Sequence, residues 1–377
     1  MLAPDRMPLV LLCAGGTGGH LFPAEALAAA LAQRGIAVDL ATDARAEKYG
    51  KAFPAGNIHV VRSDTVRGRD PVALARTGLS LLGGAVDAWR LLGRLRPAAV
   101  VGFGGYPSAP PLLVATLRGI PTLIHEQNAV MGRANRLLAS RVTRIATGFA
   151  GVLDAAPALA AKAVHTGNPL RPMVLAAAAT PYHAPQADGP VRLVVFGGSQ
   201  GARAMSDVVP PAIGHLAPVL RQRLAVVQQA REEDVARVTA RYREMGVAAE
   251  VAPFFTDLPA CIAAAHLVVS RSGASTVAEL AAIGRPAILA PLPGALDQDQ
   301  SANAGVLERA GGAIRLERDS FTPNRVAAEL TGLTGAPDRL AAMAAAARTV
   351  AAPDAAERLA DAVQALMDGT LAKARRG

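Results

Sequence analysis

The stretch LVLLCAGGTGGH occupies residues 9–20 and joins a short apolar run to a glycine-rich turn and a histidine. An apolar run without charges is typical of a strand buried on both faces of a parallel sheet. In the residues that follow, Leu27 and Leu31 lie four positions apart, and Gly35 stands where a helix would end. The stretch therefore predicts a strand, a tight turn and a helix, the opening unit of an α/β domain.

The second half of the chain repeats this arrangement. The apolar run Arg192–Phe196 leads into Gly197–Gly201, and a helical stretch begins near Ala202. Further short apolar runs alternate with helical stretches, so we expect two doubly wound parallel-sheet halves that each open with a glycine turn. The expected strands are Leu9–Ala14, Ala37–Thr42, Ala99–Gly104, Thr122–Gln127, Arg192–Gly197, Leu224–Gln229, Ala249–Phe254, Leu267–Arg271 and Ala287–Leu292.

Residues 167–172 read GNPLRP and form the expected joint between the halves, because glycine and proline interrupt regular structure there. We expect an N-terminal domain over residues 1–168 and a C-terminal domain over residues 169–353. Pro353 interrupts a helical stretch near the end of the chain. The last helix, within residues 354–377, is expected to pack back on the N-terminal domain.

Composition limits the class of protein. Of 377 residues, 51% are hydrophobic and 18% are charged, which excludes a disordered chain. The net charge of +9 suits an acidic partner, such as an anionic lipid surface or a phosphorylated substrate. Because 3% of the residues are aromatic and no nucleic-acid motif is present, nucleic acid is not an expected partner. Two cysteines, Cys13 and Cys261, favour a reducing, cytoplasmic compartment.

No membrane span is expected from the sequence. The longest stretch without charged residues, 97–117, is interrupted by prolines and glycines, whereas a span needs a continuous apolar helix. The apolar run before Gly15 could open a signal peptide, but it leads straight into the glycine turn. A buried first strand is the better interpretation.

The glycine turns and one acidic pair are each compatible with another ligand. Neither turn fits the G-x-G-x-x-G pattern of dinucleotide sites, since Leu21 stands where the third glycine should be, although Asp43 after the second strand keeps that alternative open. Asp297 and Asp299 spell the D-x-D of metal-dependent glycosyltransferases, but no other carboxylate cluster supports a metal. We therefore expect neither a metal nor another cofactor.

Polar clusters follow several expected strands at the edge where open α/β sheets bind ligands. Each alone is compatible with ordinary turn chemistry. Together with glycines and helix N-termini, which favour phosphate, they predict a polar, phosphate-bearing ligand. The clusters lie at Gly104–Ser108, His125–Asn128, Ser270–Thr276 and Asp297–Gln300, beside the two glycine turns.

These motifs closely resemble, in order over about residues 9–304, the peptidoglycan glycosyltransferase family called MurG. The resemblance implies a GT-B fold, with two Rossmann-like domains that face each other across a cleft. It also implies transfer of N-acetylglucosamine from UDP-N-acetylglucosamine to an undecaprenyl-pyrophosphoryl-N-acetylmuramoyl-pentapeptide, with inversion and without an essential metal. The motifs are Gly15–His20, Gly104–Tyr106, His125–Asn128, Thr166–Pro169 with Arg171, Gly197–Arg203, Ser272–Glu279, and Gln300 with Asn303–Ala304.

Carried over by motif, the resemblance places the donor on the C-terminal domain. Ser199 and Arg171 would hold the diphosphate, and the backbone of Phe255 would meet uracil. Glu279 would accept hydrogen bonds from the ribose hydroxyls, and Gln300 and Asn128 would contact the sugar. The other implied donor residues are Thr17, Gly18, Gly19, Ala274, Ser275, Thr276, Val277 and Ala278, and the implied acceptor residues are Gly16, Gly104, Gly105 and Tyr106.

His20 is the candidate general base for the muramoyl hydroxyl. An imidazole, with an ordinary pKa of about 6.5, is suited to accept this proton, and the positive end of a helix dipole keeps the ring neutral. Glu126, on a neighbouring loop, is the competing catalytic residue, and a structural role for His20 is the third possibility. A sugar-nucleotide epimerase and a non-catalytic UDP-sugar-binding scaffold are the alternative functions.

A membrane-docking surface is expected between Arg62 and Arg96, where arginines outnumber aspartates by seven to three. Within this stretch Leu79, Leu82, Val86 and Trp89 fall on one helical face. An apolar face with a basic rim suits the anionic cytoplasmic face of the inner membrane, bound peripherally. A helix that faces the core would show the same pattern. The resemblance leaves open association with other cell-wall synthesis proteins.

Overall fold

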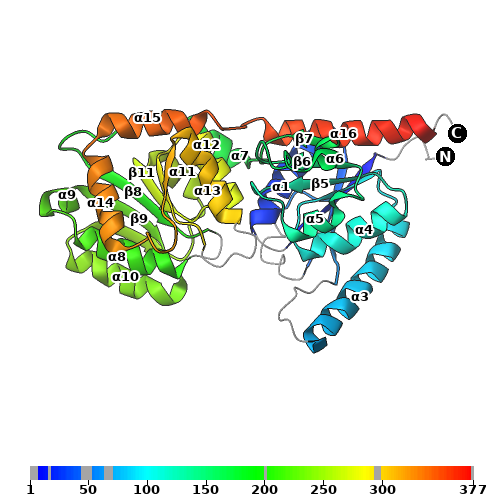
Figure 1. Cartoon of the computed structure of the whole chain (residues 1–377), viewed down its shortest axis with the longest axis horizontal. Coiled ribbons are helices and arrows are strands. Elements are labelled where there is room, and N and C mark those ends of the chain that lie inside the picture. Colours follow the sequence, from blue (N-terminus) through cyan, green and yellow to red (C-terminus); the bar gives the residue numbers. More distant parts are fainter. Residues whose placement is uncertain are drawn as a thin grey trace. The chain divides into compact units, whose positions relative to one another are not determined.

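The computed structural model describes residues 7–15, 18–43, 53–62, 71–198, 202–292 and 299–374, with the side chains of 71–81 and 370–374 excepted. The chain divides into two compact units (Figure 1). The first unit comprises Met1–Arg171 and Ala352–Gly377, and the second comprises Pro172–Ala351. Arg171 thus belongs to the first unit, whereas the boundary expected after residue 168 assigned it to the other part of the chain.

The described strands of the first unit form one parallel sheet in the order β3-β2-β1-β4-β5-β6-β7. β1 lies between β2 and β4, and Val10 is in register with Val38 on one side and Ala99 on the other. The chain therefore leaves β1 first toward one edge and later toward the other, which makes the β1/β4 boundary the switch point of the sheet. The strands are β1 (Leu9–Cys13), β2 (Ala37–Thr42), β3 (Ile58–Val60), β4 (Ala99–Gly102), β5 (Thr122–Glu126), β6 (Arg144–Thr147) and β7 (Ala163–His165).

Helices cover this sheet, and one of them comes from the C-terminal end of the chain. In α16 (Ala355–Ala374) the side chains of Leu359 and Val363 are fully buried in one core cluster with Leu27 and Leu31 of α1 (Gly18–Gln33). Arg34, just after α1, pairs with Glu357 and Asp361 of α16. The other elements of this unit are α3 (Pro71–Leu95), η2 (Tyr106–Ser108), α4 (Ala109–Leu117), α5 (Arg133–Ala139) and α6 (Pro157–Ala160).

The second unit repeats the plan. Its described strands are ordered β10-β9-β8-β11-β12-β13, all parallel, with the switch point between β8 and β11. The strands are β8 (Val191–Phe196), β9 (Leu224–Gln229), β10 (Ala248–Ala252), β11 (Leu267–Ser270), β12 (Ala287–Leu289) and β13 (Ala313–Arg315). The helices are α7 (Pro172–Ala178), α8 (Arg203–Gly214), α9 (Pro218–Arg223), α10 (Glu232–Glu244), α11 (Leu258–Ala264), α12 (Ala274–Ile283), α13 (Asp299–Ala310), α14 (Pro323–Thr334) and α15 (Pro337–Arg348).

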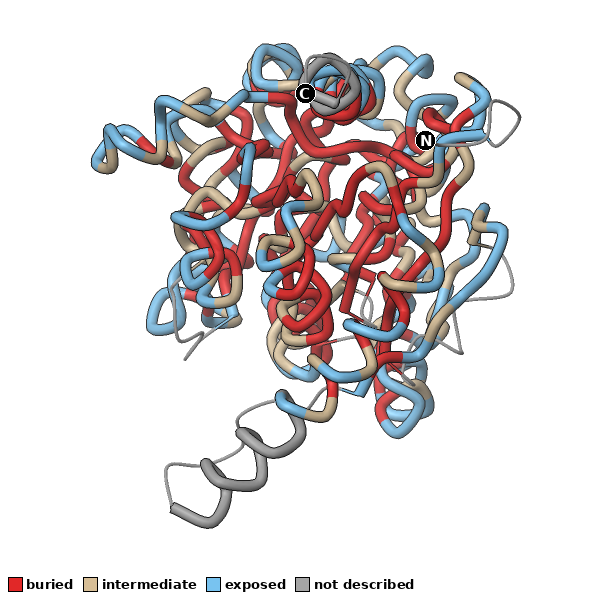
Figure 2. Tube along the Cα trace, turned by 90° about the vertical axis from the view of Figure 1, so that its right-hand side faces the viewer, coloured by how far each residue is buried: buried red, intermediate tan, exposed pale blue. Residues whose placement is uncertain are grey.

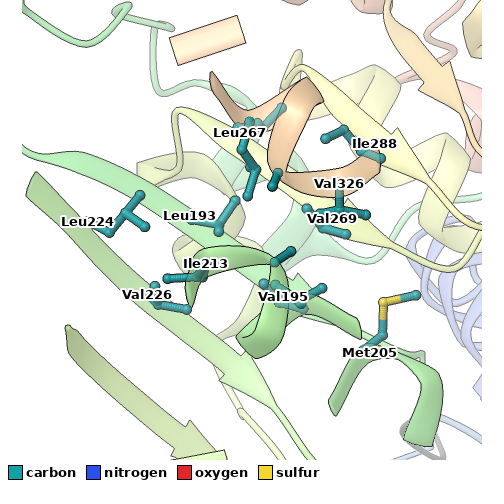
Figure 3. Packing of buried hydrophobic residues seen from close by; sticks show 14 of the residues in the cluster. Leu193, Val195, Met205, Ile213, Leu224, Val226, Leu267, Val269, Ile288 and Val326 are labelled. Atoms are coloured by element: carbon teal, nitrogen blue, oxygen red, sulfur yellow. The ribbon is translucent and has the colours of Figure 1, made fainter. Parts of the chain in front are cut away.

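The apolar strand runs form the cores, because their residues are buried. Figure 2 shows buried residues in the interior of the trace and exposed residues mainly at its periphery. In the second unit Leu193 and Val195 of β8 pack with Leu267 and Val269 of β11, and Met205 of α8 belongs to the same cluster (Figure 3). The predicted fold class, two doubly wound parallel sheets, is confirmed. The nine expected strands are present with ends shifted by up to three residues, whereas β3, β6, β7 and β13 were not expected.

We predict that Leu359→Ala destabilises the first unit by about 2–5 kcal/mol, because it leaves a cavity against α1. The protein has a single tryptophan, Trp89, which lies in this unit, so its fluorescence during urea unfolding reports the change. Asp368→Ala, on the exposed face of the same helix, is the matched control. An unchanged unfolding midpoint for Leu359→Ala would show that α16 adds nothing to this core.

Candidate active site

The His20 ring lies against three glycines at the switch point of the first sheet. A Cβ added to Gly15 or Gly105 would lie 3.2 or 3.3 Å from Cδ2 of His20, and one added to Gly104 would lie 3.5 Å from Cε1. Gly104 and Gly105 also have φ angles of +82° and +75°, which side chains rarely tolerate. The glycines after β1 and β4 therefore form a seat that fixes the imidazole near the N-terminus of α1.

Glu126, at the end of β5, has both carboxylate oxygens engaged. Oε1 accepts from the backbone and side-chain nitrogens of Asn128 (2.9 and 3.3 Å), and Oε2 accepts from Gly132 N (2.9 Å) and Asn135 Nδ2 (2.8 Å). Burial raises the pKa of this carboxyl, and the hydrogen bonds oppose the rise. Because four donors occupy about four lone-pair positions, Glu126 organises the loop from Asn128 to Gly132.

His125 and Gln127 point to the other side of the strand and hold the segment that leads to the joint. Nε2 of His125 lies 3.0 Å from the carbonyl oxygen of Gly167, so this nitrogen carries the proton, and Nδ1 accepts from Gln127 (3.2 Å). The Asn168 side chain donates to the carbonyl of Gln127 (3.0 Å). Burial lowers the pKa of His125 to about 4. The ring is therefore neutral at pH 7 and has a structural role.

Arg171, at the end of this segment, lies over the first unit's helix α1. Its guanidinium carbon is 3.8 Å from the centre of the Phe22 ring.

The other expected site residues of the first unit lie in turns and at a helix start. Tyr106, which follows Gly104 and Gly105 and begins η2, is half-buried, and so is Asn128. Gly18 and Gly19 form the first two positions of α1, where backbone N–H groups have no helical acceptor.

The switch point of the second sheet lies beside the N-terminus of α12. Ser275, in the first turn, has a buried hydroxyl without a hydrogen-bond partner in the described part of the chain. Glu279 lies four residues later on the same face and is buried, and Ala274, Thr276 and Val277 are buried as well, whereas Ala278 is half-buried. A hydroxyl, a carboxylate and helix N–H groups thus lie within two turns of one helix.

Two loops complete this edge of the second sheet. Arg271 donates to the carbonyls of Ala290 and Pro291 (2.9 and 2.8 Å), and Ser272 donates to the carbonyl of Gln300 (2.7 Å). The Gln300 side chain accepts from the backbone N–H of Leu292 (3.0 Å). These bonds tie both ends of the segment between β12 and α13 to the β11 turn. Phe255, half-buried, lies in the loop after β10.

Some expected site residues lie outside the described residues. These are Gly16, Thr17, Ser199 and Asp297. Among the residues that are described, no group of three or more His, Cys, Asp or Glu side chains could hold a metal ion. In the same part of the chain, no helix combines the length and apolar character that a membrane crossing requires.

Family models cover most of the chain. The model for the glycosyltransferase family 28 N-terminal domain matches residues 10–147, and that for the family 28 C-terminal domain matches residues 192–359. The chain belongs to glycosyltransferase family 28.

Relatives in this family are close in sequence. Proteins from Rhodopseudomonas palustris (strain BisB18) and Nitrobacter hamburgensis are 63% and 62% identical over 94% of this chain and cover 95% and 96% of their own lengths. Both are named UDP-N-acetylglucosamine--N-acetylmuramyl-(pentapeptide) pyrophosphoryl-undecaprenol N-acetylglucosamine transferase. These matches confirm the resemblance found in the sequence.

Solved structures agree with this family assignment. The crystal structure of Acinetobacter baumannii MurG is 31% identical with a TM-score of 0.76, covering 95% of this chain and 99% of that one. A UDP-GlcNAc 2-epimerase from Neisseria meningitidis has a TM-score of 0.66 over 94% of this chain and 99% of that one, but is 14% identical. The second likeness shows the fold alone.

Sequence reasoning missed Asn135. Its amide nitrogen lies 2.8 Å from Glu126 and would be 3.6 Å from a Cβ on Gly104, so it connects the Glu126 loop to the seat of His20. A buried asparagine in the otherwise basic and apolar helix α5 was the available signal. Asn135 lies nine residues after Glu126, and this spacing matches no helix or strand period that would predict their contact.

We predict that His125 makes the first unit less stable as the pH falls below about 6.5. The folded pKa of about 4 lies below the unfolded value of 6.5, so in this window the unfolded chain binds the extra proton. Above pH 6.5 the neutral His125 does not reduce the free energy of unfolding. Near pH 4 the reduction in this free energy approaches about 3 kcal/mol. Urea unfolding at several pH values should show this slope in the native protein and a shallower one in His125→Gln. Equal slopes would contradict the prediction.

Proposed function

We propose that this protein transfers N-acetylglucosamine from UDP-N-acetylglucosamine to the 4-hydroxyl of the muramoyl group in an undecaprenyl-pyrophosphoryl-muramoyl-pentapeptide. The observation that carries the proposal is the identity of 61–63% with relatives named for this transfer, over almost the whole length of both chains. The two sheet switch points, each with a glycine turn and polar groups, support it. The epimerase alternative has only a likeness of fold behind it.

In the proposed arrangement the second unit binds the donor. The turn after β8, with Ser199, and the N-terminus of α12 would receive the diphosphate and nucleotide, because helix N-termini favour negative charge. The Ser275 hydroxyl has the unmet hydrogen bond that a ligand can satisfy. Glu279 would accept from the ribose hydroxyls, Phe255 would meet uracil and Gln300 the sugar. The guanidinium of Arg171 would place a positive charge beside the diphosphate.

The first unit would bind the acceptor at the turn of Gly16 and Gly18 and beside Gly104, Gly105 and Tyr106. The muramoyl oxygen attacks C1 of the sugar while the bond from C1 to the UDP oxygen breaks, which inverts C1. The hydroxyl proton passes to His20, and UDP leaves with the electron pair of the broken bond. Helix N-terminal amides and Arg171 stabilise the charge that develops on the diphosphate.

The hydrogen bonds of Glu126 favour His20 as the base. A base needs a lone pair that faces the hydroxyl, whereas both oxygens of Glu126 already accept two protein hydrogen bonds each. We assign Glu126 to positioning, through the loop that carries Asn128 and through Asn135 beside Gly104. The seat of three glycines gives His20 a fixed ring orientation, which proton transfer requires.

The first unit also has the surface expected to meet a membrane. Leu82, Val86 and Trp89 of α3 are 66%, 47% and 49% exposed, and Leu113 and Leu117 of the adjoining α4 are exposed too. The core-facing alternative is therefore wrong for these α3 side chains, and Leu79 lies outside the described side chains. Large apolar side chains exposed on one helix face and on the adjoining helix support the proposal of an interaction site here.

The charges around this apolar surface suit an anionic lipid layer. Arg90 and Arg94 are exposed on α3, and the guanidinium of Arg118 lies 4.2 Å from the centre of the Trp89 ring. The acidic Asp87 is paired with Arg62 through contacts of 2.7 and 2.9 Å. We propose that this surface docks peripherally on the cytoplasmic face of the inner membrane, where the lipid-linked acceptor would be bound.

The transfer itself is tested with labelled UDP-N-acetylglucosamine, with and without the lipid-linked muramoyl acceptor. Label should enter the lipid phase only when the acceptor is present. His20→Ala should lower kcat by about 10²-fold or more with UDP affinity unchanged, since positioned base catalysis contributes that much. Label in a free sugar product would favour the epimerase. If His20→Ala keeps its kcat while Glu126→Gln loses it, Glu126 is the base.

Membrane docking is tested by sedimentation with vesicles that contain anionic phospholipid. The double substitution Leu82→Ser and Trp89→Ser should weaken binding about tenfold or more, because each apolar side chain contributes roughly 1.5–3 kcal/mol on burial. Added salt should also weaken binding. Val219→Ser, at an exposed site of the second unit, is the control. Vesicle binding that does not change with anionic lipid content, with salt or with these substitutions would contradict the proposal.

A further inference from the structure

Helix α1 carries two side chains that face Arg171. The Phe22 ring lies under the guanidinium, with 3.8 Å between the ring centre and the guanidinium carbon, well within the reach of a cation–π contact. Glu25 follows one turn later and is half-buried. Burial raises the pKa of the Glu25 carboxyl, and the positive charge of Arg171 partly offsets that rise. All three residues belong to the first unit.

A guanidinium carbon that lies 3.8 Å over a ring centre is attracted to the face of that ring. The aromatic ring covers one face of the planar group, whereas the five N–H bonds of arginine lie in the plane. Two N–H bonds on one edge of the group can recognise two oxygens of a phosphate, and contact at its face does not use these bonds. An aliphatic side chain in place of Phe22 would fill the volume but would supply no electrostatic attraction to the cation.

The backbone on the N-terminal side of Arg171 is held as well. The carbonyl of Gly167 accepts from His125, and the Asn168 side chain donates to Gln127. Pro172 begins α7, and its ring restricts the conformation of Arg171. With the backbone anchored three residues before it, the remaining freedom of Arg171 lies in its long side chain, and Phe22 limits that freedom.

We propose that Phe22 is a positioning residue that presents the Arg171 guanidinium to the donor diphosphate. The inference rests on the proposed function, in which Arg171 meets that diphosphate. Phe22 lies two residues after His20 on the same helix, so α1 would orient both the base and the cation that stabilises the leaving group. Phe22 itself touches neither substrate in this account.

The test compares the binding of UDP and of uridine by calorimetry, since their affinity ratio isolates the phosphate contribution. Phe22→Leu should weaken UDP binding about twofold to tenfold, because a guanidinium that Phe22 no longer holds must be ordered when UDP binds, and should leave uridine binding unchanged. Phe22→Tyr, which keeps the ring, should bind UDP like the native protein. In an Arg171→Ala background, Phe22→Leu should have no further effect.

Equal losses for UDP and uridine, or no loss for Phe22→Leu, would overturn the inference, and so would an additive loss in the Arg171→Ala background. Unfolding curves followed by Trp89 fluorescence show whether each variant is folded, and Phe22→Tyr keeps the test valid if Phe22→Leu is unstable. Label transfer by the native protein reports on the proposed function separately. If transfer persists while Phe22→Leu binds UDP normally, the inference alone fails.

Discussion

The packing of the His20 ring against the backbone of Gly15, Gly104 and Gly105 is the contact on which the site of the first unit depends. It needs two strands, β1 and β4, to end side by side, and parallel pairing at the switch point supplies that arrangement. A Cβ at Gly15 or Gly105 would crowd Cδ2 of the ring at 3.2 or 3.3 Å, and the positive φ of Gly104 and Gly105 disfavours a side chain there. The same contact holds the imidazole, our proposed base, near the N-terminus of α1.

The alternation of side chains along β5 and the residues after it separates two tasks. His125 and Gln127 hold the segment that ends at Arg171, while Glu126 and Asn128 shape the loop beside the proposed acceptor turn. The buried side chains of His125 and Glu126 make hydrogen bonds at both of their polar atoms, as buried polar groups require. One strand thereby connects the proposed diphosphate cation with the surroundings of the base.

Much of this was predictable from the sequence because its signals are local. Buried parallel strands appear as apolar runs, and the glycine turns mark the switch points, so the fold class and the position of His20 at the first switch point followed. Glu279 came from the family resemblance alone, and its role stays a prediction. β6 and β13 were missed because they are short and contain arginine. The hydrogen bond from Asn135 to Glu126 and the contact of Arg171 with Phe22 join residues that are not related by a helix or strand period. The sequence pattern therefore could not predict them.

The division of labour between the two units is the central claim, and a crystal structure of the full chain with UDP-N-acetylglucosamine tests it most directly. The account predicts the nucleotide at the second unit, with its ribose hydroxyls on Glu279, a hydrogen bond to the Ser275 hydroxyl, and its diphosphate facing the turn after β8. A nucleotide bound instead at the glycine turn after β1, with Glu279 facing no ligand, would contradict it.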